Sequence, residues 1–230
     1  MWDEAVLVPG CRSRTNPLDK YDDKGGTMNR PNDDTSRALI DAAHRLLTES
    51  GPEALTVRRI ANAAGMSTMN VYSRFGGKDG VIDVLYRDGF RRMFEQVLTV
   101  PRSDDAAAHL VDLMSAYRNW ALANPAYYGI MFEHLVLGFE PSADSVAFAW
   151  EKMGEFVARV EQAQDAGMIA RFDDWDAAGV ATWLWANCHG AIGLELDGTG
   201  GDGVDWAAMF DHGIRIAVAG LHPSVALSRR

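Results

Sequence analysis

The segment from Thr56 to Lys78 constrains the fold more than any other part of the chain. It reads TVRRIANAAGMSTMNVYSRFGGK and divides into two short helical patterns on either side of Gly65. Small Ala61 lets the two helices cross closely, Gly65 permits a sharp turn, and Val71 is expected to face the core. Thr56 and Ser67 stand where helix N-caps are needed. This spacing predicts a helix-turn-helix.

The second of these helices is expected to present polar side chains to the outside. Its outward residues are Thr68, Met69, Asn70, Tyr72 and Ser73, and the flanking cations are Arg58, Arg59, Arg74 and Lys78. A helix with short polar groups and a fringe of cations can enter the major groove of DNA. The alternative is an ordinary helical hairpin with a solvated face. The coincidence of turn, cap and charge features favours the DNA-binding interpretation.

The segment from about Thr35 to Leu98 resembles the TetR family of bacterial transcriptional regulators. The resemblance rests on SRALIDAAHRLLTESGPEALTVRRIANAAGMS followed by VYSRFGGKDGVIDVLY. It implies a three-helix DNA-binding domain and the start of a helix that joins this domain to the rest of the chain. Phe75 is expected in the core. Arg74 departs from the family pattern, in which histidine or tyrosine usually precedes this phenylalanine, and Met69-Asn70 stands where smaller residues often occur.

The resemblance also implies which side chains contact DNA. The residues near base edges would be Thr68, Met69, Asn70 and Ser73. An asparagine can pair bidentately with adenine, and methyl groups such as those of Met69 and Thr68 can touch a thymine methyl. The residues on phosphates would be Thr56, Arg58, Tyr72 and Lys78. Lys78 also begins a helix whose N-terminal dipole attracts phosphate.

The net charge of −10 is unevenly distributed along the 230 residues. Residues 28–98 hold 10 basic and 9 acidic side chains, whereas residues 99–230 hold 8 basic and 18 acidic ones. Because phosphate contacts depend on local charge, the acidity of the whole chain does not argue against DNA binding.

Cysteine usage and hydropathy indicate a cytoplasmic protein. Cys11 and Cys188 are the only cysteines and lie far apart, so no disulfide framework is expected. No apolar run approaches the ~18 residues of a membrane span. The N-terminus lacks the basic start and continuous apolar run of a secretory signal.

The chain is expected to be all-α, with about nine helices in two domains. Residues 1–30 lack periodicity and predict a mobile, non-essential extension; the alternative is an arm that contacts DNA through Arg30, Arg12 and Arg14. Residues 31–78 would form the DNA-binding domain, and residues 79–230 a larger domain for effector binding and dimerisation. The helices expected outside the helix-turn-helix are 35–50, one from Lys78, then 105–122, 125–137, 142–166, 173–197 and 204–220.

The segment Trp183–Leu196, which reads WLWANCHGAIGLEL, is apolar nearly all round as a helix. Its Trp185, His189 and Gly190 resemble a TetR subgroup named for a Trp-His-Gly motif. Such a helix must be covered from two directions, by its own domain and plausibly by a second subunit. The last helix adds Trp206, Phe210, Gly213, Ala217 and Gly220 at spacings of three and four. Two helices from each subunit would form a two-fold interface, as a palindromic operator requires.

Aromatic residues on the middle helices suggest a pocket for a small apolar or aromatic effector. The candidate lining residues are Tyr117, Trp120, Tyr128, Phe132 and Phe156, with Asn187 and His189 as polar groups. Further candidates are Tyr127, Met131, His134, Phe148 and Met153. The alternative is that these aromatics are ordinary core residues.

No catalytic or metal-binding pattern was found, so neither an enzyme nor a cofactor is expected. Gly198, Gly200 and Gly203 match G-x-G-x-x-G, but a helix precedes them where a strand is required. Neighbouring Cys188 and His189 diverge by about 100° on a helix, so they do not form a metal pair. We therefore expect a homodimeric repressor that binds double-stranded DNA and is released by an effector. The alternatives are an activator or effector-independent regulator and, more remotely, a helical enzyme or carrier.

Overall fold

The computed structural model describes residues 33–199, 201 and 203–225. This part of the chain contains nine α-helices, one 3-10 turn and no β-strand, which confirms the predicted all-α fold. The elements are α1 (Asp34–Ser50), η2 (Pro52–Ala54), α2 (Val57–Ala63), α3 (Thr68–Phe75), α4 (Lys78–Val97), α5 (Ala106–Ala123), α6 (Pro125–Phe132), α7 (Ala143–Asp165), α8 (Ala177–Leu196) and α9 (Trp206–Gly220). The predicted extension over residues 1–30, with Arg12, Arg14 and Arg30, lies outside the described residues, as does Gly200.

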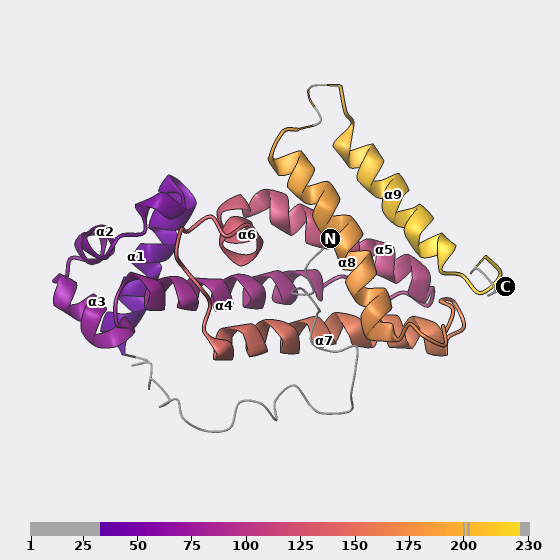
Figure 1. Ribbon diagram of the computed structural model, residues 1–230, viewed down its shortest axis with the longest axis horizontal. Helices are drawn as coiled ribbons and strands as arrows, with labels where there is room; N and C mark the ends of the chain where they lie inside the picture. Colours follow the sequence, from indigo (N-terminus) through magenta and orange to yellow (C-terminus); the bar gives the residue numbers. More distant parts are fainter. Residues whose placement is uncertain (1–32, 200, 202, 226–230) are drawn as a thin grey trace, which may run out of the picture. The chain divides into compact units, whose positions relative to one another are not determined.

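Helices α1, α2 and α3 pack together with the first turns of α4 and form the predicted helix-turn-helix (Figure 1). The side chain of Thr56 caps α2 by accepting a hydrogen bond from the backbone N–H of Arg59 at 3.3 Å. The chain then reverses at Gly65, where φ is +67°. The core beneath the motif is formed by Leu39, Ala43, Leu47, Leu55, Ile60, Ala61, Val71, Phe75, Val81, Ile82 and Leu85.

Ser67 occupies the N-cap position of α3, but its hydroxyl makes no capping bond to the backbone. The hydroxyl instead accepts from the side-chain amide Nδ2 of Asn70 at 3.2 Å. The prediction that the Ser67 side chain caps this helix is therefore wrong: the residue stands at the N-cap, but its hydroxyl bonds to a neighbouring side-chain amide and not to the backbone.

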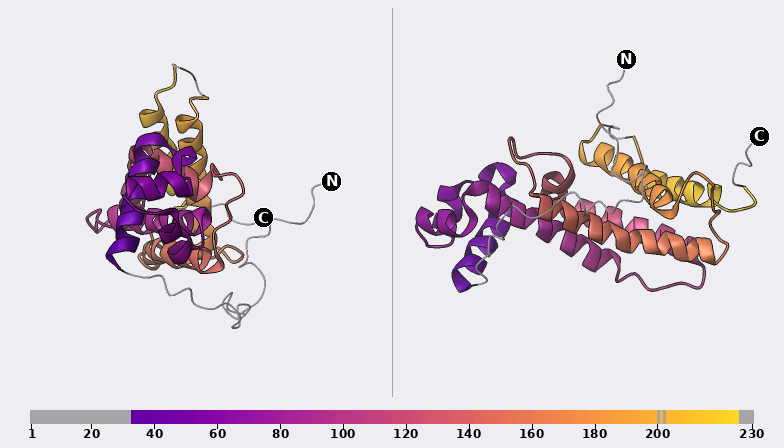
Figure 2. Two further views of the ribbon diagram at one scale, coloured as in Figure 1. Left: turned by 90° about the vertical axis from the view of Figure 1, so that its left-hand side faces the viewer. Right: turned by 60° about the horizontal axis from the view of Figure 1, so that its bottom comes forward.

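Helix α4 runs from the helix-turn-helix into the C-terminal helices (Figure 1). It contacts α1 and α3 near its start, and α5, α6 and α7 further along. One continuous hydrophobic core joins these parts, and the described residues belong to one compact unit. Helices α8 and α9 pack against each other at a distance from α1–α3, as the right view in Figure 2 shows.

Three helices in the C-terminal part have shorter bounds than expected. Helix α6 ends at Phe132 instead of near residue 137, because His134 has a φ of +50°, which a right-handed helix does not allow. Helices α8 and α9 begin later than residues 173 and 204. Their N-caps are Asp176 and Asp205, whose carboxylates accept backbone bonds of 2.8 and 3.0 Å.

Candidate functional site: recognition surface and apolar cavity

The residues expected on DNA lie on α2, α3 and the first residue of α4, three elements that pack together. We call this set the recognition surface; it comprises Thr56, Arg58, Thr68, Met69, Asn70, Tyr72, Ser73 and Lys78. Met69 is 70% exposed and Tyr72 is 54% exposed, whereas Val71 and Phe75 on the opposite side of α3 are buried. The helical phase of α3 therefore turns its polar side outward, free to meet a partner.

Arg74 joins the recognition surface to the start of α1. Its guanidinium donates from Nε and Nη2 to the two carboxylate oxygens of Asp33, at 3.4 and 3.1 Å. Its Nη1 donates to Oδ1 of Asn70 at 3.0 Å. Asp33 is itself held in place because it caps α1, accepting from the backbone N–H of Ser36 at 2.7 Å. The hydrogen bonds from Arg74 and Ser36 lower the pKa of the Asp33 carboxyl to about 2.

Lys78 begins α4, and only Gly76 and Gly77 separate it from the last residue of α3. Its Nζ lies 3.8 Å from the carboxylate of Asp79, and its side chain is 36% exposed. A Cβ atom on Gly80 would lie 1.8 Å from the carbonyl oxygen of Phe75. Only glycine therefore lets the first turn of α4 pack this closely against the end of α3.

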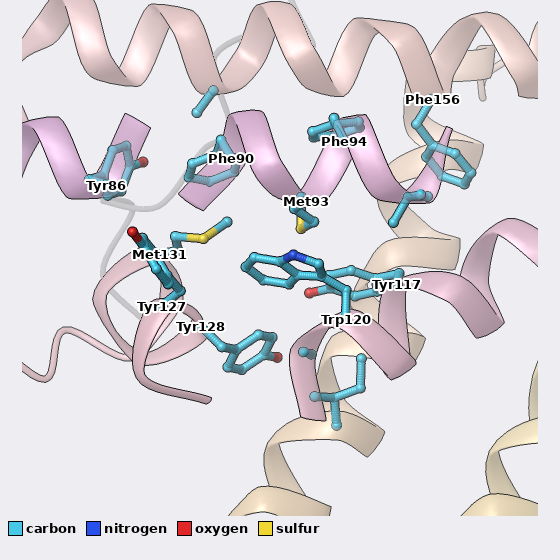
Figure 3. Close-up of a cluster of buried hydrophobic side chains, with 14 of the residues drawn as sticks. Tyr86, Phe90, Met93, Phe94, Tyr117, Trp120, Tyr127, Tyr128, Met131 and Phe156 are labelled. Carbon is cyan, nitrogen blue, oxygen red and sulfur yellow. The ribbon is translucent and has the colours of Figure 1, made fainter. Parts of the chain in front are cut away.

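An apolar cavity of about 30 Å³ lies among α4, α5, α7 and α8. Its lining consists of Met93, Phe94, Val97, Leu98, Met114, Tyr117, Met153, Phe156 and Trp185. Figure 3 shows Met93 and Phe94 of α4 beside Tyr117 of α5 and Phe156 of α7. The indole N–H of Trp185 donates to the Tyr117 hydroxyl at 3.3 Å, and burial raises the pKa of that hydroxyl well above its usual value. The lining is thus uncharged and contains three flexible methionines.

Of the seven residues predicted for the pocket, Tyr117 and Phe156 line this cavity. Trp120 is fully buried beside them without lining it. Asn187 is exposed, and its amide donates to the backbone carbonyl of Trp183 at 2.7 Å. The expectation that Asn187 faces the pocket is wrong, because the phase of α8 turns its side chain to solvent, about 100° around the helix from buried Cys188.

The remaining predicted pocket residues, Tyr128, Phe132 and His189, form an aromatic cluster next to Trp185. The Phe132 ring centroid lies 5.8 Å from that of Trp185 and 5.2 Å from that of His189. The Tyr128 hydroxyl lies 2.5 Å from Nδ1 of His189. Burial lowers the pKa of His189 and raises that of Tyr128, so both are neutral near pH 7. The cluster meets the cavity at two lining residues: it packs against Trp185, and the Tyr128 ring centroid lies 6.5 Å from that of Tyr117.

Met153, one of the further candidates, lines the cavity, whereas sequence reasoning missed the contributions of α4, Met114 and Trp185. In the sequence, a stripe of apolar or small residues at spacings of three and four predicts a buried side of α4; it comprises Ile82, Leu85, Gly89, Met93 and Val97. No periodicity could show which other helix that stripe would meet. His134, another candidate, is exposed on the turn after α6 and does not line the cavity.

Helices α8 and α9 each carry an exposed stripe with a glycine in its middle. We call these two stripes the outer face; it comprises Trp183, Asn187, Gly190 and Leu194 of α8, and Met209, Gly213, Ile216 and Gly220 of α9. Ile216 is 72% exposed and Leu194 is 48% exposed. On α9 the stripe differs from the predicted one: Phe210 is buried, with the guanidinium carbon of Arg118 5.5 Å from its ring centroid.

Two negative findings concern the described residues alone. None of their helices is both long and apolar enough to pass through a membrane. Nowhere among them do three His, Cys, Asp or Glu side chains gather closely enough to hold a metal ion.

Comparison with known proteins identifies both halves of the chain. Residues 39–85 match the family model described as bacterial regulatory proteins of the tetR family. Residues 110–217 match the model for a tetracycline repressor-like C-terminal domain. An HTH-type transcriptional regulator of Mycobacterium tuberculosis is 26% identical over 212 residues, which cover 79% of this chain and 89% of the relative.

Solved structures share the fold. A protein of unknown function from Rhodococcus sp. RHA1 superimposes with a TM-score of 0.71 at 24% identity, covering 84% of this chain and 98% of that one. TetR from Acinetobacter baumannii, solved in complex with minocycline, gives a TM-score of 0.59 at 17% identity, with 85% and 99% covered. Proteins described by these family models regulate transcription and are not enzymes. The chain belongs to the TetR family and is a DNA-binding transcriptional regulator.

Proposed function

We propose that this regulator is a homodimeric repressor that a small apolar or aromatic effector releases from a palindromic operator. The observation that carries the proposal is the course of α4. Its first residue, Lys78, belongs to the recognition surface, and its last turns supply Met93, Phe94 and Val97 to the cavity. One helix therefore belongs to both the candidate DNA site and the candidate effector site. A regulator of this kind works beside the bacterial chromosome, in the cytoplasm.

On DNA, α3 would enter the major groove and place Thr68, Met69, Asn70 and Ser73 near base edges. Exposed Tyr72 and Lys78 would bind phosphates on either side of the groove, together with Thr56 and Arg58 from the start of α2. The exposure of Thr68, Met69, Tyr72 and Ser73 supports this assignment.

Dimerisation would bury the outer face of α8 and α9. Ile216, Leu194, Met209 and Trp183 are large apolar side chains between 37% and 72% exposed. A Cβ atom at Gly190 or Gly213 would meet no atom within 4 Å, so both glycines leave room for a close helix from a second subunit. A two-fold dimer presents two copies of α3, which is what two half-sites of a palindrome need.

The size of the cavity suggests how binding reaches the DNA. Pockets that hold drug-sized ligands measure roughly 300–1,000 Å³, whereas this cavity measures about 30 Å³ and has room for only about two waters. An effector can enter only by moving the lining outward, and a third of that lining belongs to Met93, Phe94 and Val97 of α4. Binding would therefore displace α4 and, through Gly80 and Phe75, the recognition helix.

Helix α6 offers a second connection between cavity and DNA-binding helices. Tyr127 contacts His44 of α1 and Asp88 of α4 through its hydroxyl. The next residue, Tyr128, contacts His189 of α8. Figure 3 shows the two tyrosine rings pointing in different directions from the same helix. A shift of α6 would therefore change its contacts with α1 and α4 and its contact with α8.

The proposal is tested in two steps. Genomic selection of DNA fragments bound by the purified protein yields the operator, and the genes next to it name candidate effectors. Each candidate is then added to the operator complex while DNA binding is followed by fluorescence anisotropy. Release of the operator at saturating effector is expected. In vitro transcription distinguishes repression from activation, and an effector-independent regulator would release its operator with none of the candidates.

A cavity-filling variant locates the effector. Met153→Trp adds bulk inside the lining without touching the recognition surface. It should bind the operator as the natural protein does but lose the response to effector. Leu137→Trp adds the same side chain at a 95% exposed position outside both the cavity and the outer face; it is the control and should keep the response. A Met153→Trp protein that responds normally would place the effector site elsewhere.

A further inference from the structure

Asn70 of the recognition surface belongs to a chain of hydrogen bonds that links Ser67 and Arg74 to Asp33 at the start of α1. Asp33 accepts from Arg74 through both carboxylate oxygens, Arg74 donates to Oδ1 of Asn70, and Asn70 donates through Nδ2 to the hydroxyl of Ser67. Arg74 is only 21% exposed, so its guanidinium is held between these partners instead of reaching into solvent.

This arrangement determines which way the Asn70 amide faces. Arginine carries donors alone, so the atom of Asn70 that faces it must be the oxygen. Ser67 sets no such preference, because a hydroxyl both donates and accepts. Arg74 is therefore the group that selects one of the two amide orientations, which differ by a 180° rotation and exchange a donor for an acceptor.

The selected orientation leaves Asn70 able to read a base. Its Nδ2 keeps one N–H after donating to Ser67, and its Oδ1 keeps one lone pair after accepting from Arg74. A donor and an acceptor side by side are what bidentate recognition of adenine requires. If the amide rotated freely, it would offer that pair in either order and discriminate less well between bases.

We propose that Arg74 is a specificity-determining positioning residue, which Asp33 holds in place so that it orients the Asn70 amide for base readout. Asp33 has a second effect. Its carboxylate neutralises a cation beside the groove that would otherwise bind phosphates of any sequence. This inference rests on the proposed insertion of α3 into the major groove.

In vitro selection from a randomised duplex library tests the proposal with the full-length protein. The natural protein should enrich a palindromic motif that includes a strongly preferred base opposite Asn70. Changing that base should weaken binding by roughly five- to 150-fold, the range for one bidentate pair. Arg74→Met should lose most of this preference at that one position in both half-sites, while the other positions of the motif persist.

Two further variants separate positioning from other roles. Ser67→Ala removes the second partner of Asn70 but leaves Arg74, so it should keep the base preference. Asp33→Asn still caps α1 through Oδ1 but loses the negative charge and the acceptor for Nη2 of Arg74, so it should weaken the preference and tighten binding to an unrelated duplex. The matched control for lost charge is Asp165→Asn, which breaks the exposed Asp165–Arg171 pair far from α3 in sequence and should change neither quantity.

Several results would overturn the inference. One is an unchanged motif for Arg74→Met and Asp33→Asn; another is loss of the preference in Ser67→Ala but not in Arg74→Met. A folded Arg74→Met protein that binds all sequences equally weakly would make Arg74 a phosphate contact instead. Failure of the natural protein to enrich any sequence would refute the proposed recognition surface itself, which distinguishes the two failures.

Discussion

Replacing Tyr127 by phenylalanine tests the polar link between the DNA-binding helices and the rest of the protein. The Tyr127 hydroxyl lies 2.8 Å from Nδ1 of His44 on α1 and donates to Oδ2 of Asp88 on α4 at 3.0 Å. A carboxylate only accepts, so the single hydroxyl proton goes to Asp88 and His44 must donate from Nδ1. Tyr127 is 1% exposed, so the substitution removes one oxygen and leaves the packing of the ring nearly unchanged.

The expected loss follows from these two hydrogen bonds. A bond to a charged group contributes about 1.5–3 kcal/mol and a neutral one about 0.5–1.5 kcal/mol. Asp88 keeps its bonds from Arg91 and Arg92, so we place the contribution of the Tyr127–Asp88 bond at the lower end of the range for charged groups. Burial opposes ionisation of Asp88, but these bonds outweigh it and hold the pKa of the carboxyl below its usual range. We expect a loss of about 2 kcal/mol, or roughly 4–8 °C in Tm for a chain of this size.

Urea unfolding of the full chain measures the loss, and Tyr128→Phe is the matched control. Tyr128 is also 1% exposed, but its hydroxyl contacts His189 on α8 and Tyr117 on α5 and has no contact with α1. Both variants should lose stability, and Tyr127→Phe, which removes the contact with α1, should weaken the effect of the effector on operator binding more than Tyr128→Phe does. A change below about 0.5 kcal/mol in Tyr127→Phe would refute the hydrogen-bond reasoning. Equal effector responses in the two variants would refute the coupling through Tyr127.

Three further predictions concern DNA contacts, dimerisation and pH. Lys78→Ala should weaken operator binding without unfolding the protein and lower the slope of log affinity against log salt by about one per half-site; an unchanged slope would remove Lys78 from the phosphate contacts. Ile216→Glu should sediment as a monomer, because it places a charge in the outer face, whereas Met69→Glu on α3 should remain a dimer. Burial lowers the pKa of His44, His109 and His189, so the folded chain binds fewer protons than the unfolded chain once the pH falls below about 6.5. The free energy of unfolding should therefore be lower at pH 5.5 than at pH 7.5, and His189→Gln should reduce this difference.

The helix-turn-helix was predictable because its determinants are local in sequence. Thr56 caps the helix that follows it, the turn falls at Gly65, and Val71 is buried by the phase of a single helix. The state of Ser67 was not predictable. Its hydroxyl is taken by Asn70, which is oriented by Arg74, and Arg74 is held by Asp33, 41 residues earlier in the chain. Only the folded arrangement of α1 and α3 brings these groups together.

The C-terminal part was predictable as helices but not as a site. Hydrophobic periodicity shows that one side of a helix is buried, yet it does not name the helix on the other side of the contact. The stripe of α4 was therefore recognised while its place in the cavity was not. On α9 both the inner residue Phe210 and the outer residue Ile216 are apolar, so the pattern could not separate the face toward α5 from the face toward solvent.

The uneven distribution of charge should orient the protein as it approaches DNA, although no single contact shows this. Residues 99–230 carry 18 acidic and 8 basic side chains, whereas residues 28–98 carry 9 and 10. Near a duplex the acidic region is repelled and the cations around α3 are attracted, so the field of the protein turns the recognition surface toward DNA before contact.

In a two-fold dimer the two acidic regions also repel each other, and burial of the outer face must overcome that repulsion. Salt screens both effects. Raising the salt concentration from about 0.05 to 0.2 M should weaken operator binding, as measured by anisotropy. The same change should strengthen dimerisation, as measured by sedimentation at several protein concentrations. A dimer that weakens with salt as the operator complex does would mean that ion pairs, and not the apolar outer face, hold the subunits together.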